Sequence, residues 1–356
     1  MKTSHNNFLN LAFNIARINL GKTKSNPSVG CVVVKNHSVI SSGYTSINGR
    51  PHAEFNSLNI NKNFKNSDLY VTMEPCTHQG LTPPCTQIIK KKGIKRVFFS
   101  LYDLDKRTNK KATKILSKRK IKVFKIFNKR FNNFYQSYYL NKNKSLPSID
   151  AKIAISKDYL TINKKDRWIT NINSRKRVHL IRSEYDSILS TSKSINKDNS
   201  LLNCRLNGFD KQKPDLIIVD LNLKIKTNIK LFKKVKHRKI YIVTSILKDK
   251  KISFLKKRGI KFIFIQSLKE KVDFINLFKL LKQKGFNRIL VESGLIFLNE
   301  LLKNSLIFNL YLFKTSVNLG KNGKNNTSNN IIKKLKLGNK IKVNLDNNNL
   351  YKVKIK

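Results

Sequence analysis

Short apolar runs alternate with segments of helical periodicity along most of the chain, and this alternation restricts the fold to the α/β class. In the first part, we expect helices over residues 8–20, 52–60, 86–92, 110–117 and 128–140 and strands over 29–34, 39–45, 68–73, 96–100 and 121–127. The first two strands are joined by a short polar turn and resemble a hairpin. This order predicts a mixed sheet with helices on its faces.

A second alternation begins at Ile149, after a polar stretch at Asn141–Pro147 that we interpret as a linker. We expect strands over 149–155, 187–189, 216–219, 240–243, 261–265 and 288–291 and helices over 174–182, 250–257, 272–284 and 295–303. A chain of 356 residues is long enough for two domains, each with its own core. We therefore divide it into residues 1–144 and 145–356. The Asn- and Lys-rich residues 321–330 and 347–349 are expected to form loops.

Three short motifs in the first part combine residue types that bind zinc. They are His52-Ala53-Glu54, Pro75-Cys76 and Pro84-Cys85. His52 and Glu54 open a predicted helix, whose N–H groups favour a negatively charged water. Pro75 suits the start of the next helical segment, where its missing N–H costs nothing. Three protein ligands leave one tetrahedral position open, which is typical of catalytic zinc.

Glu54 stands beside these ligands without being one of them. Zinc lowers the pKa of a bound water to about 7, and a neighbouring carboxylate can take the proton and pass it to a leaving amine. Base deaminases with zinc carry such a His-x-Glu and Pro-Cys signature, with two residues between the cysteines. Here the longer segment Thr77–Pro84 separates them. Its His78 is either an alternative ligand or, as we favour, a residue of the substrate pocket.

The net charge of +54 favours anionic partners. Binding of nucleic acid is one interpretation. The lysines are scattered rather than gathered in a stripe or tail, so we favour a general compositional bias. No apolar run of about 18 residues predicts a membrane span, and the N-terminus shows no signal peptide, so we expect a cytoplasmic protein. Cys31 and Cys204 are expected to be small buried residues.

Several longer segments resemble the bifunctional riboflavin-biosynthesis deaminase/reductase family. PCTHQGLTPPC, NPSVGCVVV and GRPHAE are similar to its deaminase domain, and DRWIT and VESG are similar to its reductase domain. The resemblance covers nearly the whole chain. It implies a cytidine-deaminase-like three-layer α/β/α domain followed by a dihydrofolate-reductase-like α/β domain.

The resemblance also implies two activities. The first is deamination of 2,5-diamino-6-ribosylamino-4(3H)-pyrimidinone 5′-phosphate at a zinc centre. The second is NADPH-dependent reduction of the ribosyl group, which gives 5-amino-6-(5-phospho-D-ribitylamino)uracil. The implied cofactors are Zn²⁺ and NADPH. The implied binding partner is the phosphorylated pyrimidine, and the chain is expected to self-associate. No membrane is expected as a partner, and nucleic acid is not favoured.

The same resemblance assigns individual residues. The metal ligands would be His52, Cys76 and Cys85, and the catalytic residue Glu54. The cofactor would contact Ile155, Trp168, Ser194, Asp198, Ser293 and Gly294. The substrates would contact Asn26, His78, Asp103, Asp166, Arg182, Leu202, Arg205 and Glu292.

The chain departs from the family at a few positions. The residues Asp103-Leu104-Asp105-Lys106 replace the family's Asp-Pro-Asn-Pro, and Lys110 and Ala112 stand where it has glycines. In the second domain, Asp166 and Leu221 each replace a serine. These departures motivate one alternative, a deaminase with an inactive reductase-like domain. The charge motivates another, an RNA- or tRNA-binding deaminase with a basic C-terminal module.

Overall fold

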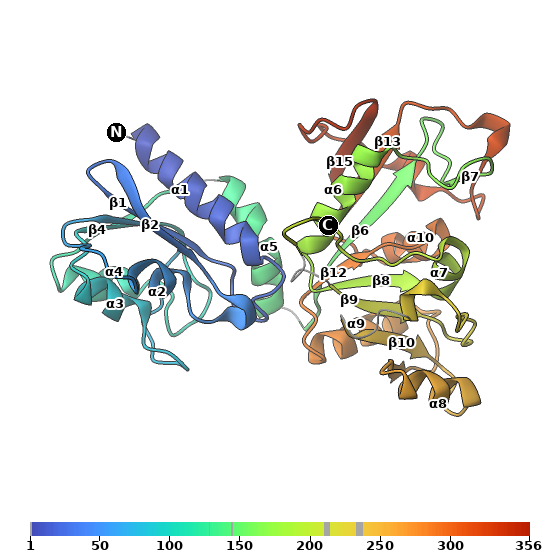
Figure 1. Ribbon diagram of the computed structural model, residues 1–356, viewed down its shortest axis with the longest axis horizontal. Helices are drawn as coiled ribbons and strands as arrows, with labels where there is room; N and C mark the ends of the chain where they lie inside the picture. The colour runs from blue at the N-terminus through green and yellow to red at the C-terminus, as the bar shows by residue number, and fades with distance from the viewer. Residues whose placement is uncertain (1, 128, 144, 210–213, 233–237) are drawn as a thin grey trace. The chain divides into compact units, whose positions relative to one another are not determined.

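The computed structural model describes residues 2–127, 129–143, 145–209, 214–232 and 238–356. The chain forms two compact units, Met1–Ser145 (unit 1) and Leu146–Lys356 (unit 2), and Figure 1 shows the elements of each. No helix within the described ranges is long and apolar enough to cross a membrane.

Unit 1 is built on a mixed sheet, as the sequence predicts. Its strand order is β2-β1-β3-β4-β5, with β1 antiparallel to β2 and β3, while β3, β4 and β5 run parallel. The central strands are buried almost throughout, which explains their continuous apolar sequences. The strand bounds are Gly30–Lys35 (β1), Ser38–Tyr44 (β2), Asp68–Met73 (β3), Arg96–Leu101 (β4) and Lys122–Lys125 (β5).

Helices cover both faces of this sheet. Helix α1 lies on one face, and α2, α3 and α4 lie on the other (Figure 1). Helix α1 approaches β1 so closely that a Cβ on Gly30 would lie 1.9 Å from the Ala12 carbonyl oxygen. Helix α5 packs its aromatic residues against α1, where the ring of Phe131 stacks on Phe13. The bounds are Lys2–Ala16 (α1), Ala53–Leu58 (α2), Cys85–Lys91 (α3), Ala112–Ser117 (α4) and Lys129–Asn143 (α5).

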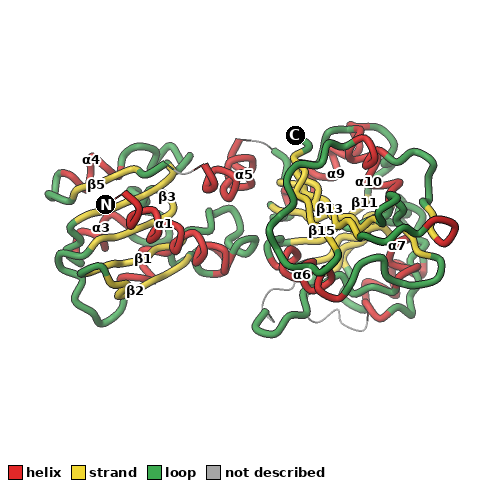
Figure 2. The backbone as a smooth tube through the Cα atoms, turned by 90° about the horizontal axis from the view of Figure 1, so that it is seen from above, coloured by secondary structure: helices red, strands yellow, loops and turns green. Residues whose placement is uncertain are grey.

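Unit 2 contains a larger sheet in the order β11-β10-β9-β8-β12-β6-β13-β15. All neighbours are parallel except β15, which runs antiparallel to β13 at the edge. Figure 2 shows this sheet in yellow with helices on both sides of it. The bounds are Ser148–Ile155 (β6), Ser187–Thr191 (β8), Asp215–Val219 (β9), Ile240–Thr244 (β10), Lys261–Phe264 (β11), Arg288–Val291 (β12), Asn309–Thr315 (β13) and Asn348–Lys354 (β15). A separate short ribbon pairs β7 (Ile162–Asn163) with β14 (Gly323–Lys324).

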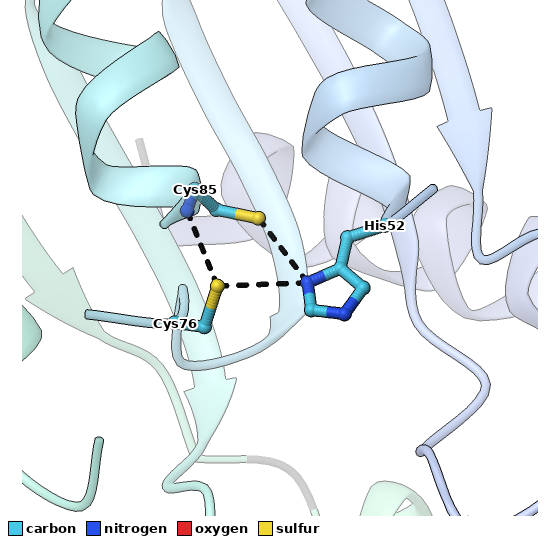
Figure 3. A group of neighbouring side chains, drawn as sticks. All are labelled: His52, Cys76 and Cys85. Carbon is cyan, nitrogen blue, oxygen red and sulfur yellow. Dashed lines mark hydrogen bonds between the residues drawn. The ribbon is translucent and has the colours of Figure 1, made fainter. Parts of the chain in front are cut away.

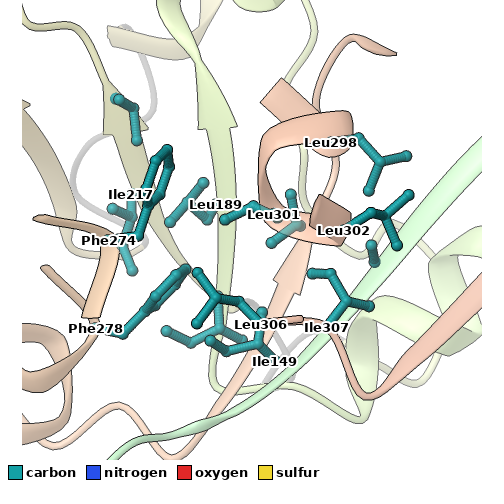
Figure 4. Close-up of a cluster of buried hydrophobic side chains, with 14 of the residues drawn as sticks. Ile149, Leu189, Ile217, Phe274, Phe278, Leu298, Leu301, Leu302, Leu306 and Ile307 are labelled. Carbon is teal, nitrogen blue, oxygen red and sulfur yellow. The ribbon is translucent and has the colours of Figure 1, made fainter. Parts of the chain in front are cut away.

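The core of unit 2 has two sides. Phe274, Phe278 and Leu298 belong to helices α9 and α10, which bury one face of the sheet (Figure 4). Helices α6, α7 and α8 contribute to the clusters on the other face. The helix bounds are Ile172–Ser183 (α6), Ser192–Asp198 (α7), Lys250–Lys257 (α8), Lys271–Gln283 (α9) and Leu295–Lys303 (α10). Short 3-10 helices span Arg17–Asn19, Ile47–Gly49, Gly320–Asn322 and Ile331–Lys334.

Some sequence predictions are wrong in detail. No helix starts at Pro75; instead Pro84 is the N-cap of α3. The expected Asn-rich loop at 347–349 contains the start of β15, because Asn348 is buried and its amide donates a hydrogen bond to Ser174 Oγ. Helix α5 continues into the expected linker and ends at Asn143. Strands β13 and β15 and helix α7 were not predicted at all.

Candidate functional site

The three expected metal ligands meet in unit 1. Their ligand atoms lie within 4.8 Å of one another, and Figure 3 shows the side chains pointing toward a common centre. His52 Nδ1 lies 3.5 Å from Cys76 Sγ and 3.4 Å from Cys85 Sγ. Tetrahedral zinc, with bonds of about 2.0 Å to nitrogen and about 2.3 Å to sulfur, would place the nitrogen about 3.5 Å from each sulfur. The donor set and its spacing therefore fit zinc.

Three different local structures position these ligands. His52 is the N-cap of α2 and has an extended backbone, with φ −73° and ψ 163°. Cys76 lies in the loop after β3, and Cys85 is the first residue of α3. The Cys85 N–H donates a hydrogen bond to Cys76 Sγ at 3.2 Å, which ties the loop to the helix start. Within the described residues, no fourth side chain joins this group of ligands, so one coordination position stays open.

Contacts between the ligands shift their pKa values. The hydrogen bond between the two thiols lowers the pKa of Cys76, whereas the same bond and burial raise the pKa of Cys85. Burial lowers the pKa of His52, but the hydrogen bond with Cys76 and the charge of Glu54 outweigh it and raise the pKa overall. Deprotonated sulfur is the form that binds zinc.

Glu54 lies in the first turn of α2, two positions after His52, and is only 3% exposed. Burial raises the pKa of its carboxyl to about 7, and the negative charge of Cys76 acts in the same direction. A carboxyl with a pKa near neutrality can both accept and return a proton at physiological pH. The predicted place of Glu54 beside the ligands is thus the place it takes in the structure.

The loop between β4 and α4 is held by Glu74, which lies two positions before Cys76 and was not predicted as a site residue. The Glu74 carboxylate, just after β3, accepts hydrogen bonds from the N–H groups of Lys110 and Ala112, both at 3.0 Å. Lys110 has a φ of 60°, a left-handed conformation that favours glycine. Glu74 therefore stabilises the backbone at the position where the family's glycine is replaced. In the sequence, the position of Glu74 directly before the Pro75-Cys76 motif could have indicated this role.

The expected pocket residues His78 and Asp103 are both attached to this loop. Thr108 Oγ1 lies 3.1 Å from His78 Nδ1. Asp103 is buried, and its Oδ1 accepts hydrogen bonds from the Tyr138 hydroxyl at 2.7 Å and from the Asp105 N–H at 3.0 Å. Asp103 thus has one oxygen committed within the protein.

Asn26 borders the turn that leads into His52. Gly49 has a φ of 91°, and a Cβ there would lie 2.1 Å from Asn26 Nδ2, so only glycine fits. The next residue, Arg50, donates from Nη1 to Thr82 Oγ1 at 2.6 Å and thereby bridges to the segment between the cysteines. Arg50 was not predicted as a site residue.

In unit 2, the structure brings Arg182 and Glu292 together. Arg182 Nε and Nη2 donate to the two Glu292 carboxylate oxygens at 2.5 and 2.9 Å, and both side chains are largely buried. Burial raises the pKa of Glu292, but Arg182 more than offsets this, and the pKa is lowered overall. Arg182 Nη1 also donates to the Asn203 carbonyl oxygen at 3.0 Å, and Asn203 Oδ1 accepts from Arg205 Nη1 at 2.7 Å.

Two of the expected cofactor residues meet at the N-terminus of α10, and Trp168 and Asp198 share contacts with Arg167. The Gly294 N–H donates to Ser194 Oγ at 3.1 Å, and Ser293 is the preceding residue. Trp168 is half exposed, and the guanidinium groups of Arg167 and Arg175 lie 4.9 and 4.8 Å from its ring centroid. Arg167 also donates to the Asp198 carbonyl oxygen.

The remaining expected residues are placed individually. Ile155 is the fully buried last residue of β6. Leu202 is buried with a φ of 47°. Asp166 is exposed and accepts a hydrogen bond from the Trp168 N–H at 3.2 Å. Among the described residues, no hydrogen bond or ion pair joins the side chains of these three residues to the Arg182–Glu292 pair or to the Ser194–Gly294 pair.

Two further basic residues of unit 2, Lys152 and His179, were not predicted as site residues. Lys152 lies on β6; burial lowers its pKa, while the nearby Glu292 charge opposes this. Burial, followed by the charges of Arg182 and Arg205, lowers the pKa of His179 to about 4. His179 Nδ1 lies 2.8 Å from the Asn203 carbonyl oxygen. Single basic residues give no signal in a sequence with this many lysines.

We expect the His179 pKa to make unit 2 less stable in mild acid. In the unfolded chain, His179 takes up a proton near pH 6.5, whereas in the native structure it does so only near pH 4. The free energy of unfolding is therefore full above about pH 6.5 and decreases as the pH falls toward 4, because protonation then favours the unfolded chain. After allowance for partial exposure, the loss is about 1–2 kcal/mol. Urea unfolding followed by Trp168 fluorescence measures it. If His179→Asn shows the same pH dependence as the parent chain, His179 is not responsible.

A buried His/Cys/Cys group beside a glutamate, on a five-stranded mixed sheet, defines a zinc-dependent deaminase. The family model of the cytidine and deoxycytidylate deaminase zinc-binding region matches residues 2–101, and that of the RibD C-terminal domain matches residues 144–351. The chain belongs to the RibD family. It is a bifunctional deaminase and reductase of riboflavin biosynthesis that uses Zn²⁺ and NADPH.

Relatives match over most of their length. The chain is 30% identical over 311 residues to the riboflavin biosynthesis protein RibD of Aquifex aeolicus, covering 86% of this chain and 85% of that protein. It is 30% identical over 323 residues to RibD of Buchnera aphidicola, with coverage of 86% and 85%. The solved structure of Acinetobacter baumannii RibD, form 1, has a TM-score of 0.81 at 24% identity, covering 99% of both chains.

The solved deaminase/reductase of Thermotoga maritima has a TM-score of 0.82 at 23% identity, again over 99% of both chains. At such identities, the two structural matches establish the fold alone. They agree with a cytidine-deaminase-like first unit and a RibD reductase-type second unit.

Proposed function

We propose that unit 1 removes the exocyclic amine of 2,5-diamino-6-ribosylamino-4(3H)-pyrimidinone 5′-phosphate, with Zn²⁺ held by His52, Cys76 and Cys85. The observation that carries this proposal is the convergence of these three ligands beside the buried Glu54. When bound, zinc supplies a Lewis acid that makes a water acidic near neutral pH.

Glu54 moves the protons in this proposal. Its carboxylate accepts a proton from the attacking water and delivers a proton to the exocyclic amine, which leaves as ammonia while the ring carbon gains an oxygen. The raised pKa of Glu54 supports both transfers because donor and acceptor forms are then close in energy. Asn26, His78 and Asp103 would orient the pyrimidine, with His78 and Asp103 held by the Thr108 and Tyr138 contacts.

Unit 2 then reduces the ribosyl group of the deaminated product to a ribityl chain. NADPH, when bound, supplies the hydride for the anomeric carbon. The ring C–O bond breaks and its oxygen takes a proton. Lys152 could supply that proton, because burial and the nearby Arg182 cation lower its pKa, although the Glu292 charge opposes this shift. Arg205 suits the 5′-phosphate because a guanidinium group offers paired donors, and Arg182, whose Nε and Nη2 donate to Glu292, adds positive charge.

We further assign the cofactor to the residues around the start of α10. Ser293 and Gly294 form the turn before α10, where backbone can approach a phosphate, and Ser194 of α7 accepts a hydrogen bond from the Gly294 N–H. Ile155, Trp168 and Asp198 would complete this surface, and Asp166 and Leu202 would contact the substrate. Self-association stays a prediction from the family resemblance. A nucleic-acid deaminase is not favoured, because the second unit belongs to a reductase family.

One assay separates the two activities. The purified chain is given the diaminopyrimidine substrate, and ammonia release and the loss of NADPH absorbance are followed together. Both signals support the proposal. Ammonia without NADPH loss would select a deaminase with an inactive second unit, as the replacements at Asp166 and Leu221 allow.

We expect Cys85→Ala to lose bound zinc and ammonia release together. Removing one of three protein ligands leaves too few donors to hold the ion against competition from solvent. Metal analysis of the purified variant measures the zinc content. The matched control is Cys204→Ala, which removes a buried thiol from unit 2 and is expected to keep a full zinc content. Full zinc retention in Cys85→Ala would point to His78 as a ligand.

A further inference from the structure

Arg238 of unit 2 makes an unusual set of hydrogen bonds. It precedes β10, and within the described part of the chain its guanidinium group donates to main-chain carbonyl groups. Its Nη1 donates to the Leu202 oxygen at 2.6 Å and to the Pro214 oxygen at 3.2 Å, and its Nη2 donates to the Leu201 oxygen. Among the described residues, Arg238 forms no ion pair with a carboxylate.

Two of these carbonyl groups, those of Leu201 and Leu202, belong to the segment that carries the expected substrate contacts Leu202 and Arg205. Leu202 has a left-handed backbone, with φ 47°, which is uncommon for a residue with a branched side chain. The next carbonyl, of Asn203, accepts from Arg182 Nη1, and the Asn203 side chain holds Arg205. Arg238 and Arg182 together therefore fix three consecutive carbonyl groups.

This arrangement has an electrostatic cost. Burial lowers the pKa of Arg238 to about 10, and the charges of Arg182 and Arg205 act in the same direction, opposed by Asp215. Burial and then Arg182 also lower the pKa of Arg205. Three cations that disfavour one another form a region of positive potential, which a bound phosphate dianion would relieve.

We propose that Arg238 is a positioning residue of the reductase half. It holds the segment from Leu201 to Arg205 in the conformation that presents Leu202 and Arg205 to the phosphorylated pyrimidine. The inference rests on the proposed function of unit 2. It assigns to Arg238 no contact with substrate, but a geometric role that acts through the main chain.

The role predicts an effect on substrate binding rather than on the chemical step. Without the guanidinium fork, the carbonyl groups of Leu201, Leu202 and Pro214 lose their common donor, and the strained turn at Leu202 can relax. In Arg238→Met, we expect the KM for the deaminated pyrimidine to rise at least about ten-fold, while the KM for NADPH stays within about two-fold and kcat within about three-fold. Ammonia release by unit 1 serves as a control in the same molecule.

Coupling to Arg205 distinguishes positioning from a general loss of structure. Arg205→Met alone is also expected to raise the pyrimidine KM. The double variant should be no worse than the poorer single variant by more than about two-fold, because Arg205 is already misplaced when Arg238 is absent. Arg258→Met, at an exposed arginine that stacks on Phe254, is the matched control and should leave both KM values unchanged.

Arg238→Lys tests the fork itself and serves if Arg238→Met fails to fold, as judged by loss of NADPH binding. A lysine keeps the charge but cannot hold three carbonyl groups in the same geometry, so its pyrimidine KM should remain raised at least about five-fold. A wild-type KM in Arg238→Lys, or KM effects that multiply in the double variant, would overturn the proposal. The proposed function is tested separately, by whether the parent chain oxidises NADPH with this pyrimidine.

Discussion

Replacing Glu54 with glutamine is expected to reduce ammonia release by about 10²–10⁴-fold while bound zinc is retained. Glutamine has the size of the carboxylate but cannot accept or return a proton. The three ligands are left intact, and the helix that places His52 still begins at the same residue. The measurement is ammonia release together with metal analysis of the same purified sample.

The matched control is Asp68→Asn, another carboxyl-to-amide change in unit 1. Asp68 lies at the start of β3, the end away from Cys76, and pairs with Arg96. It should leave ammonia release within about two-fold of the parent chain. NADPH oxidation with supplied deaminated product should be unaffected in both variants. A fully active Glu54→Gln enzyme with bound zinc would show that another group moves the protons.

The second large effect is expected from Arg182→Met. This change leaves the Glu292 carboxylate buried without its bidentate partner. Breaking a buried pair by removal of one member typically costs about 3–5 kcal/mol. We expect about 3 kcal/mol of the unfolding free energy of unit 2 to be lost, together with NADPH oxidation, while ammonia release persists. Urea unfolding is read from Trp168, the single tryptophan of the chain.

A double variant separates stability from function. Arg182→Met with Glu292→Met removes both charges and should recover most of the stability, but not the reductase activity. Lys303→Met breaks an exposed pair with Glu300 and should change the unfolding free energy by less than about 1 kcal/mol. Full NADPH oxidation by Arg182→Met would remove Arg182 from the proposed substrate site.

The metal centre was the part of the molecule that the sequence determined best. His, Cys and a non-ligand Glu are few in this chain, and the motifs that contain them are short and ordered. Cys31 and Cys204 are buried, as predicted. The helix and strand types over the first part also follow from periodicity, because buried strands and amphipathic helices differ in their repeat.

The rest depended on contacts between distant residues. The asparagine-rich start of β15 resembled a loop, since composition does not show that Asn348 finds a buried partner in Ser174. The left-handed Lys110 is stabilised by Glu74, and neither residue alone signals the other. The role proposed for Arg238 likewise depends on its hydrogen bonds to three main-chain carbonyl groups, and the sequence does not show which carbonyl groups a side chain contacts.

The strand order of unit 2 has a consequence for synthesis on the ribosome. Strand β6 is the first of its sheet to be made, yet its neighbours are β12 and β13, and Asp150 bonds to Asn309 across a separation of 159 residues. Such distant pairing is slow to form. The nascent deaminase half can therefore mature early, whereas β6 must wait, unpaired on both edges, until much later codons have been translated. Chaperone dependence would accordingly fall on the reductase half.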